Sequence, residues 1–220
     1  ELQVSGSYIR ESEKMEMLGL TIADNLKWGN HVENVLGKVR GANGLLSRLA
    51  GHVPSKDLLP VVHGLLLSRI RYGLAVYGSA RLHESDPVNG QIASLQKEMN
   101  KALRLVYGKK LIDKVSIESL LKETNTKSVN QMVAECQLRE VWRSLKYSLP
   151  LSEHLQMADE ERMRTTRSTG SHLIKTLIVN PFQRNLATVW NSLPIEKRTM
   201  NVTKNVAFKN FSEFASSLPL

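Results

Sequence analysis

The candidate functional residues of this sequence are basic side chains. Their type and spacing suit phosphate binding. Between residues 162 and 210 the chain has nine Lys and Arg residues and one acidic residue, Glu196, so this stretch holds +8 of the formal net charge of +9. Guanidinium groups alternate there with Ser and Thr hydroxyls, and both kinds of donor suit phosphate oxygens. We therefore predict phosphate contacts from Arg162, Arg164 and Arg167; the alternative is a basic surface loop without a partner.

Two further basic sets lie on stretches with helical periodicity. One set shares a face at spacings near one helical turn: Lys97, Lys101 and Arg104. The other lies opposite an apolar stripe that begins near Trp28: Lys38, Arg40 and Arg48. A basic isoelectric point near 9.7 favours a polyanionic partner, so both sets are predicted nucleic-acid contacts. The alternative for each set is a solvated helix face.

Catalytic and metal-binding patterns are missing from the sequence. It has no phosphate-binding loop, no dinucleotide fingerprint, no zinc-protease helix and no nucleophile elbow. The aspartates are scattered, whereas two-metal nucleotidyl transfer needs clustered carboxylates. The six His residues are scattered too, and the single cysteine, Cys136, excludes an internal disulfide and zinc-finger spacing. We expect no catalytic residue, no metal site and no cofactor in this chain; a small hydrolase is the least favoured alternative.

Helical periodicity accounts for most of the chain, so the predicted fold class is mainly α. Apolar spacing and cap residues predict helices at about 28–49, 55–79, 92–107, 116–122, 128–149, 181–190 and 206–215. Ser55, Ser116, Ser128 and Asn180 are the predicted N-caps. No run of about 18 apolar residues exists, so no membrane span or membrane partner is expected.

Residues 1–24 have a different pattern, which predicts a short β-hairpin or strand. Glu16 to Ile22 is an apolar run with Gly19 inside it, followed by the turn-forming pair Asp24-Asn25. The first residue, Glu1, looks like a cut through a longer polypeptide. The predicted organisation is an N-terminal strand segment at 1–24, a helical bundle at 25–110, and a C-terminal helical region at 111–220 that carries a basic arm at 161–179.

Small and aromatic residues carry two further expectations. Three glycines near one-turn spacing, Gly37, Gly41 and Gly44, predict the close approach of another element to that helix. Five aromatic residues fall on apolar stripes, which favours core packing over stacking on bases: Trp28, Trp142, Trp190, Tyr72 and Tyr77.

Four stretches together resemble one family, the reverse transcriptases of non-LTR (LINE-like) retrotransposons of the jockey and CR1-like groups. Met17 to Ile22, with Trp28 and His31 after it, resembles the segment that follows the catalytic aspartates in that family. The other three stretches agree with the family in order and spacing: residues 69–78, residues 95–104, and residues 182–194 with the pair Phe208-Lys209 after them.

The resemblance implies a thumb and C-terminal region, with Met17, Leu18 and Gly19 as the primer grip at the palm–thumb junction. The helices after them would hold an RNA–DNA template–primer duplex. The family's catalytic aspartates would lie upstream of Glu1, in a palm that binds magnesium, so this chain would not polymerise alone. Its implied partners are RNA, DNA and the palm and fingers of the same polypeptide, inside the cell in nucleus or cytoplasm. The alternative is a freestanding helical module that binds nucleic acid or protein.

Overall fold

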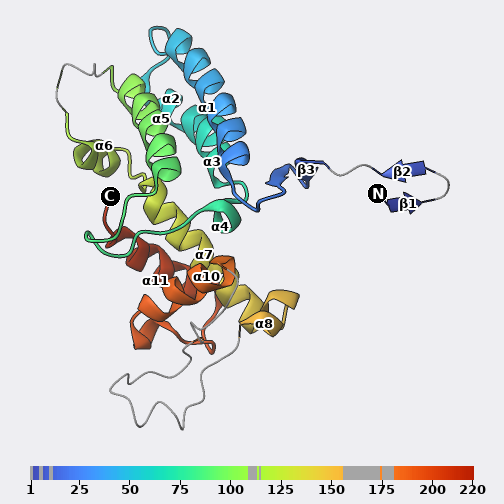
Figure 1. Ribbon diagram of the computed structural model, residues 1–220. Coiled ribbons are helices and arrows are strands. Elements are labelled where there is room, and N and C mark those ends of the chain that lie inside the picture. The colour runs from blue at the N-terminus through green and yellow to red at the C-terminus, as the bar shows by residue number, and fades with distance from the viewer. Residues whose placement is uncertain are drawn as a thin grey trace.

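The computed structural model describes residues 2–4, 7–9, 12–108, 113, 115–155, 174 and 181–220. The chain is mainly helical, with short antiparallel hairpins near its N-terminus, which confirms the predicted fold class (Figure 1). The predicted division at residues 24 and 110 stays a prediction.

Two hairpins precede the helices. In the first, β1 (Leu2–Val4) pairs with β2 (Ser7–Ile9); this pairing was not predicted as a separate hairpin. In the second, β3 (Lys14–Met17) pairs with β4 (Leu20–Ala23), as the sequence predicted. Leu18 and Gly19 both have positive φ, 50° and 75°, as in the two-residue turns that match the twist of paired strands.

The helices and helical turns follow in chain order. They are α1 (Gly29–Leu49), α2 (Ser55–Val62), the π-helical turn η1 (His63–Leu67), α3 (Ser68–Arg71), α4 (Leu74–Tyr77), α5 (Gly90–Val106), α6 (Ile117–Glu123), α7 (Val129–Lys146), α8 (Pro150–His154), α10 (Pro181–Ser192), the 3₁₀ turn η3 (Ile195–Lys197) and α11 (Lys204–Ser216). The predicted caps Ser116 and Ser128 accept hydrogen bonds from helix N–H groups, and Ser128 completes a capping box with Gln131. The predicted cap Asn180 lies outside the described residues.

The helix expected at 55–79 is divided, and its start was assigned wrongly. The N-cap residue is Pro54, and the Ser55 hydroxyl donates instead to the Val106 carbonyl at the end of α5. Backbone helicity passes from α2 through η1 to α3 and then stops at Tyr72, because Gly73 has a φ of +67° before α4 begins. A positive φ cannot continue a right-handed helix, so the chain turns there.

Two hydrophobic clusters form the core, and α7 belongs to both. The first cluster joins α1, α2, η1, α3, α4 and α5 with the N-terminal half of α7. The second joins the C-terminal half of α7 with α10 and α11, around the fully buried Trp142, Trp190 and Phe211. Figure 1 shows α7 running between the two groups of helices. Because α7 packs in both clusters, it couples their stability.

Two expectations about α1 are wrong. An added Cβ at Gly37, Gly41 or Gly44 would meet no atom within 4 Å, so these glycines do not mark the close approach of another element. They lie on the solvent side of the helix. Leu45, assigned to the apolar stripe, is 40% exposed, whereas its neighbour Leu46 is fully buried.

Candidate nucleic-acid interface

The β3–β4 hairpin presents the three residues that the family resemblance assigns to the primer grip. Met17 and Leu18 are 50% and 84% exposed. Gly19 is exposed as well. The hairpin tip is therefore accessible to another molecule, and its apolar side chains have little cover.

Tyr72 and Gly73, at the break between α3 and α4, hold this hairpin in place. The Tyr72 hydroxyl donates a hydrogen bond to the Leu18 carbonyl at 2.5 Å. A Cβ at Gly19 would lie 3.4 Å from the Tyr72 ring, and a Cβ at Gly73 would lie only 2.6 Å from Leu20 Cδ2. The Tyr-Gly pair and the Leu-Gly turn thus fit against each other, although more than 50 residues separate them.

His31, at the start of α1, fixes the base of the same hairpin. Its Nδ1 accepts a hydrogen bond from the Thr21 backbone N–H at 3.3 Å, and Asn34 donates to the Thr21 hydroxyl at 2.9 Å. The imidazole makes edge contacts with Trp28 and Tyr77. Burial, and next the positive charge of Lys38, lower the pKa of His31, while Glu16 opposes the shift. The neutral ring is the form that can accept the Thr21 hydrogen bond.

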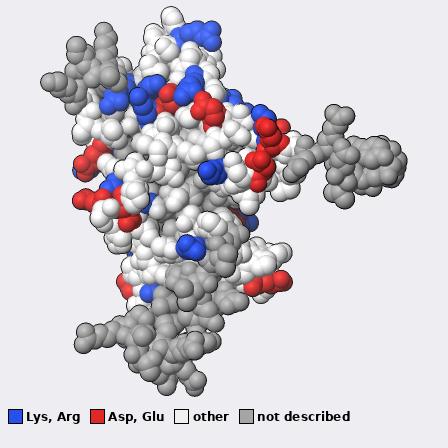
Figure 2. All heavy atoms as spheres, in the orientation of Figure 1, with Lys and Arg blue, Asp and Glu red and all other residues white. Residues whose placement is uncertain are grey.

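The three basic residues predicted on α1 are exposed. Arg40 lies 3.1 Å from Glu33 and 3.8 Å from Glu98, so its charge is partly matched. Lys38 and Arg48 have no ion pair within the described part of the chain. Figure 2 shows Lys and Arg side chains over α1 and α5, with acidic side chains among them. This face is basic but not uniformly so.

Glu98, which is 6% exposed, joins the two predicted basic helices. Its carboxylate lies 2.7 Å from Lys101 Nζ and accepts a hydrogen bond from Asn43 of α1 at 3.0 Å. Burial alone would raise the pKa of Glu98, but the hydrogen bonds from Lys101 and Asn43 and the charges of Lys101 and Arg40 lower it. Arg40 and Lys101 therefore neutralise an internal carboxylate, which leaves less of their charge for a ligand.

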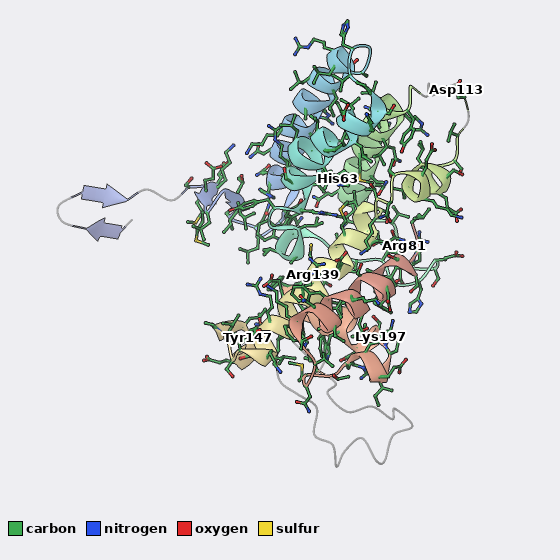
Figure 3. All side chains as sticks on the ribbon, turned by 180° about the vertical axis from the view of Figure 1, so that it is seen from behind. His63, Arg81, Asp113, Arg139, Tyr147 and Lys197 are labelled. Atoms are coloured by element: carbon green, nitrogen blue, oxygen red, sulfur yellow. The ribbon has the colours of Figure 1, made fainter. Side chains whose placement is uncertain are left out.

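The three predicted basic residues of α5 share one wall of a groove of about 700 Å³. Lys97 and Lys101 are exposed, and Arg104 is half-buried. The loop between α4 and α5 forms the opposite wall, and Ile117 of α6 and Asn130 of α7 contribute at one side. In that loop the Arg81 guanidinium donates to the carbonyl oxygens of Glu84 and Asp86 (Figure 3), so it is fixed on the wall.

The structure thus brings some predicted residues together and keeps others apart. Lys97, Lys101 and Arg104 meet in one groove, and Arg40 meets Lys101 through Glu98. In the hairpin, Leu18 and Gly19 contact Tyr72, and Met17 is half exposed. The predicted arm contacts, Arg162, Arg164 and Arg167, lie outside the described residues.

Tyr72 and His31 are the residues whose role the sequence did not predict. Apolar spacing assigned Tyr72 to the core with the other aromatics, and this was wrong, because Tyr72 is 57% exposed. Trp142, Trp190 and Tyr77 are buried as predicted. Gly73 could have indicated that the helix ends at Tyr72, since a Gly inside an apolar helix pattern indicates a break. His31 was noted in the sequence only as part of the family resemblance, and its hydrogen bond to the hairpin was not predicted.

Metal-binding groups and membrane-spanning helices were sought among the described residues. Among the described residues, no three His, Cys, Asp or Glu side chains are grouped so that they could hold a metal ion. Of the helices in the described ranges, none has the length and apolar character needed to cross a bilayer. Comparisons with protein-family models, with curated proteins and with solved structures find no significant match to this chain.

Proposed function

We propose that this chain is the nucleic-acid-binding thumb and C-terminal region of a non-LTR retrotransposon reverse transcriptase. It holds the RNA–DNA template–primer duplex, within the nucleus or cytoplasm, and does not polymerise alone. Magnesium-dependent nucleotidyl transfer belongs to the palm of the same polypeptide. The observation that supports this proposal best is the contact between the Leu18–Gly19 turn and the Tyr72–Gly73 break.

The contact matters because it joins two of the stretches on which the family resemblance rests. Each stretch contains a glycine with positive φ, Gly19 or Gly73. A Cβ at Gly73 would lie only 2.6 Å from Leu20 Cδ2, whereas a Cβ at Gly19 would be in ordinary contact with the Tyr72 ring at 3.4 Å. A hairpin that is held in place and exposes Met17 and Leu18 at its tip can contact a sugar-phosphate chain.

The basic residues of α1 and α5 supply the attraction for phosphates. Lys38, Arg48 and Lys97 are exposed and have no acidic partner within the described ranges, so their charge is available to a ligand. Phosphate contacts carry no base identity, so the expected binding depends on the shape and charge of the duplex and not on its sequence.

Duplex binding by the full chain tests the proposal. Fluorescence anisotropy with a labelled RNA–DNA hybrid measures the dissociation constant between low and moderate salt. The variant Lys38→Ala, Arg48→Ala, Lys97→Ala removes three free charges and keeps Arg40 and Lys101 as partners of Glu98. We expect weaker binding for every hybrid sequence, and a log–log salt slope that is smaller by about 2–3, since each phosphate contact contributes about 0.9.

A matched charge control uses three exposed basic residues on other helices: Lys122→Ala, Arg143→Ala and Lys209→Ala. It lowers the net charge by the same amount, and we expect it to keep the parent's salt slope. If the parent does not bind the hybrid at low salt, or if the two triple variants have equal slopes, the proposal is wrong and a freestanding protein-binding module is the better interpretation.

A further inference from the structure

The groove along α5 has a composition that differs from that of a phosphate-binding surface. Its lining is mostly apolar: Pro87, Val88, Ile92, Ala93 and Ile117 contribute carbon surface between its walls. Val88 is 65% exposed and Ile117 is 38% exposed, so two large aliphatic side chains face solvent within one concave site. Exposed apolar surface inside a groove is typical of a binding site.

Charge is placed along one wall of this apolar groove. Lys97 has no acidic partner within the described part of the chain, and the buried Nε of Arg104 has no hydrogen-bond partner there. Asp86, on the opposite wall, accepts hydrogen bonds from the backbone N–H groups of Leu82 and His83. Those hydrogen bonds are the largest causes of the lowered pKa of Asp86. Lys97 and Arg104 therefore place positive charge on the α5 side of the groove, while Asp86 places one negative charge on the loop side.

The length of the groove along α5 matches that of a short helical segment. Its lining on α5 extends from the cap residue Asn89 to Arg104, a distance of about 22 Å at 1.5 Å per residue. A helix of four turns has that length. An amphipathic helix places apolar side chains on one face and charged side chains beside them, which matches an aliphatic floor next to a basic wall.

We propose that this groove binds an acidic amphipathic helix of a partner protein. Its apolar side chains enter between Val88, Ile92 and Ile117, and its carboxylates pair with Lys97 and Arg104. Single-stranded nucleic acid suits the groove less well, because none of its described lining residues is aromatic and bases bind single-strand sites largely by stacking on aromatic rings. Val88, Ile92 and Ile117 take no part in the proposed duplex binding, whereas Lys97 contributes to both sites.

Peptide binding to the full chain tests this inference. The probe is a fluorescein-labelled helical peptide of about 18 residues with Leu at positions i, i+3, i+4 and i+7 and Glu on both sides of that stripe. Anisotropy should show saturable binding. Replacing its Leu residues with Ser, or its Glu residues with Gln, should weaken binding about tenfold or more, as expected when central contacts are removed.

Protein variants identify the groove as the site. The pair Val88→Ser, Ile117→Ser should weaken peptide binding about tenfold. Its matched control, Leu45→Ser with Val206→Ser, removes two aliphatic side chains that are exposed elsewhere and should leave binding unchanged. The protein variant with reversed charges, Lys97→Glu with Arg104→Glu, should bind a peptide with Lys in place of Glu more tightly than the original acidic peptide. A misfolded protein would not acquire that new preference.

Three outcomes of the peptide experiments would overturn the inference, and a nucleic-acid experiment provides a fourth. They are no peptide binding by the parent, equal binding by the Val88–Ile117 pair and its control, and no change of preference after charge reversal. A labelled oligouridylate of about 12 nucleotides serves as the nucleic-acid arm. If the Val88–Ile117 pair loses oligouridylate binding, the groove is a single-strand site and the peptide assignment is wrong. Hybrid binding should be the same in that pair and in the parent, so failure of the proposed duplex function would be seen separately.

Discussion

Single residues decide how the hairpin and the first helices fit together. Gly73 is the clearest case, because both its backbone conformation and its surroundings exclude a side chain. His31 is the second, because one ring nitrogen accepts a hydrogen bond from the hairpin while the other, Nε2, is buried without a partner among the described atoms. Each of these two positions gives a prediction with its own control.

We expect Gly73→Ala to destabilise the fold. A left-handed conformation costs a non-glycine residue about 1–2 kcal/mol, and the new Cβ would lie 2.6 Å from Leu20 Cδ2 unless that side chain moves. In contrast, Gly44→Ala lies in open space on α1 and should stabilise it by about 0.5–1 kcal/mol. Urea unfolding monitored by circular dichroism measures both. A Gly73→Ala protein as stable as the parent would refute the described packing of this break.

The lowered pKa of His31 predicts a loss of stability in mild acid. The unfolded histidine, with a pKa near 6.5, takes up a proton before the folded one does, so protonation favours the unfolded chain. The stability that depends on neutral His31 is therefore complete above pH 6.5 and is lost as the pH falls through the lower, folded pKa.

Unfolding free energies measured across this pH range test the His31 prediction. The pKa of His63 is also lowered, by burial first and by Arg71 second, so the parent's curve contains both residues. His31→Asn keeps an acceptor near the Nδ1 position and does not titrate, so the difference between the two curves isolates His31. Parallel curves for parent and variant would show that His31 does not contribute.

At the scale of the elements, the hairpin depends on a helix break far from it in sequence. Thr21 and Ala23 are the buried residues of β4, while all four residues of β3 are exposed. A two-stranded hairpin has little stability in water by itself. The hairpin β3–β4 is therefore kept ordered by tertiary contacts, which come from Tyr72, Asn34 and His31.

Removal of one hydroxyl should loosen this hairpin and leave the rest of the fold intact. Tyr72→Phe deletes the hydrogen bond to the Leu18 carbonyl but keeps the ring against Gly19. We expect faster amide hydrogen exchange across residues 14–23, with a change of about 0.5–1.5 kcal/mol in local opening, and little change in α5 or α7. Tyr147→Phe, at a comparably exposed tyrosine that contacts Trp142, is the control. Equal exchange in both variants would contradict this role for Tyr72.

At the scale of the whole molecule, the hydrophobic core spans most of the chain, whereas the net positive charge is concentrated in one stretch. The two hydrophobic clusters share α7, so the core extends from residue 32 to residue 218. The net positive charge lies almost entirely between residues 162 and 210. Within the described part of that range, Lys197 pairs with Glu213, and the Arg198 Nε donates to the Leu193 carbonyl. The charge of Lys197 is therefore partly matched, and Arg198 is buried.

The arm residues Arg162, Arg164 and Arg167 should therefore carry much of the long-range attraction. Changing all three to Ala should weaken binding of every duplex by a similar factor and reduce the log–log salt slope by about 2–3. Filter binding between low and moderate salt measures the slope. The triple variant Lys122→Ala, Arg143→Ala, Lys209→Ala matches the charge loss. If the arm variant keeps the parent's slope, the arm is a basic surface loop without a partner.

The sequence by itself determined the features that depend on neighbours a few residues away. Helical periodicity placed α1, α5, α6, α7, α10 and α11, and the Ser116 and Ser128 caps were predicted because capping is local. The hairpin was predicted from one glycine inside an apolar run. Each of these signals comes from residues that contact one another within about one helical turn or one strand pair.

Only the tertiary structure decided which surfaces are available. Lys97, Lys101 and Arg104 share a helix face in sequence, yet Glu98 neutralises Lys101, and a loop, α6 and α7 convert that face into the wall of a groove. Gly37 and Gly73 look alike in sequence, but one meets open space and the other meets Leu20. Burial and close approach depend on segments tens of residues apart, and local periodicity contains no information about which of them pack together.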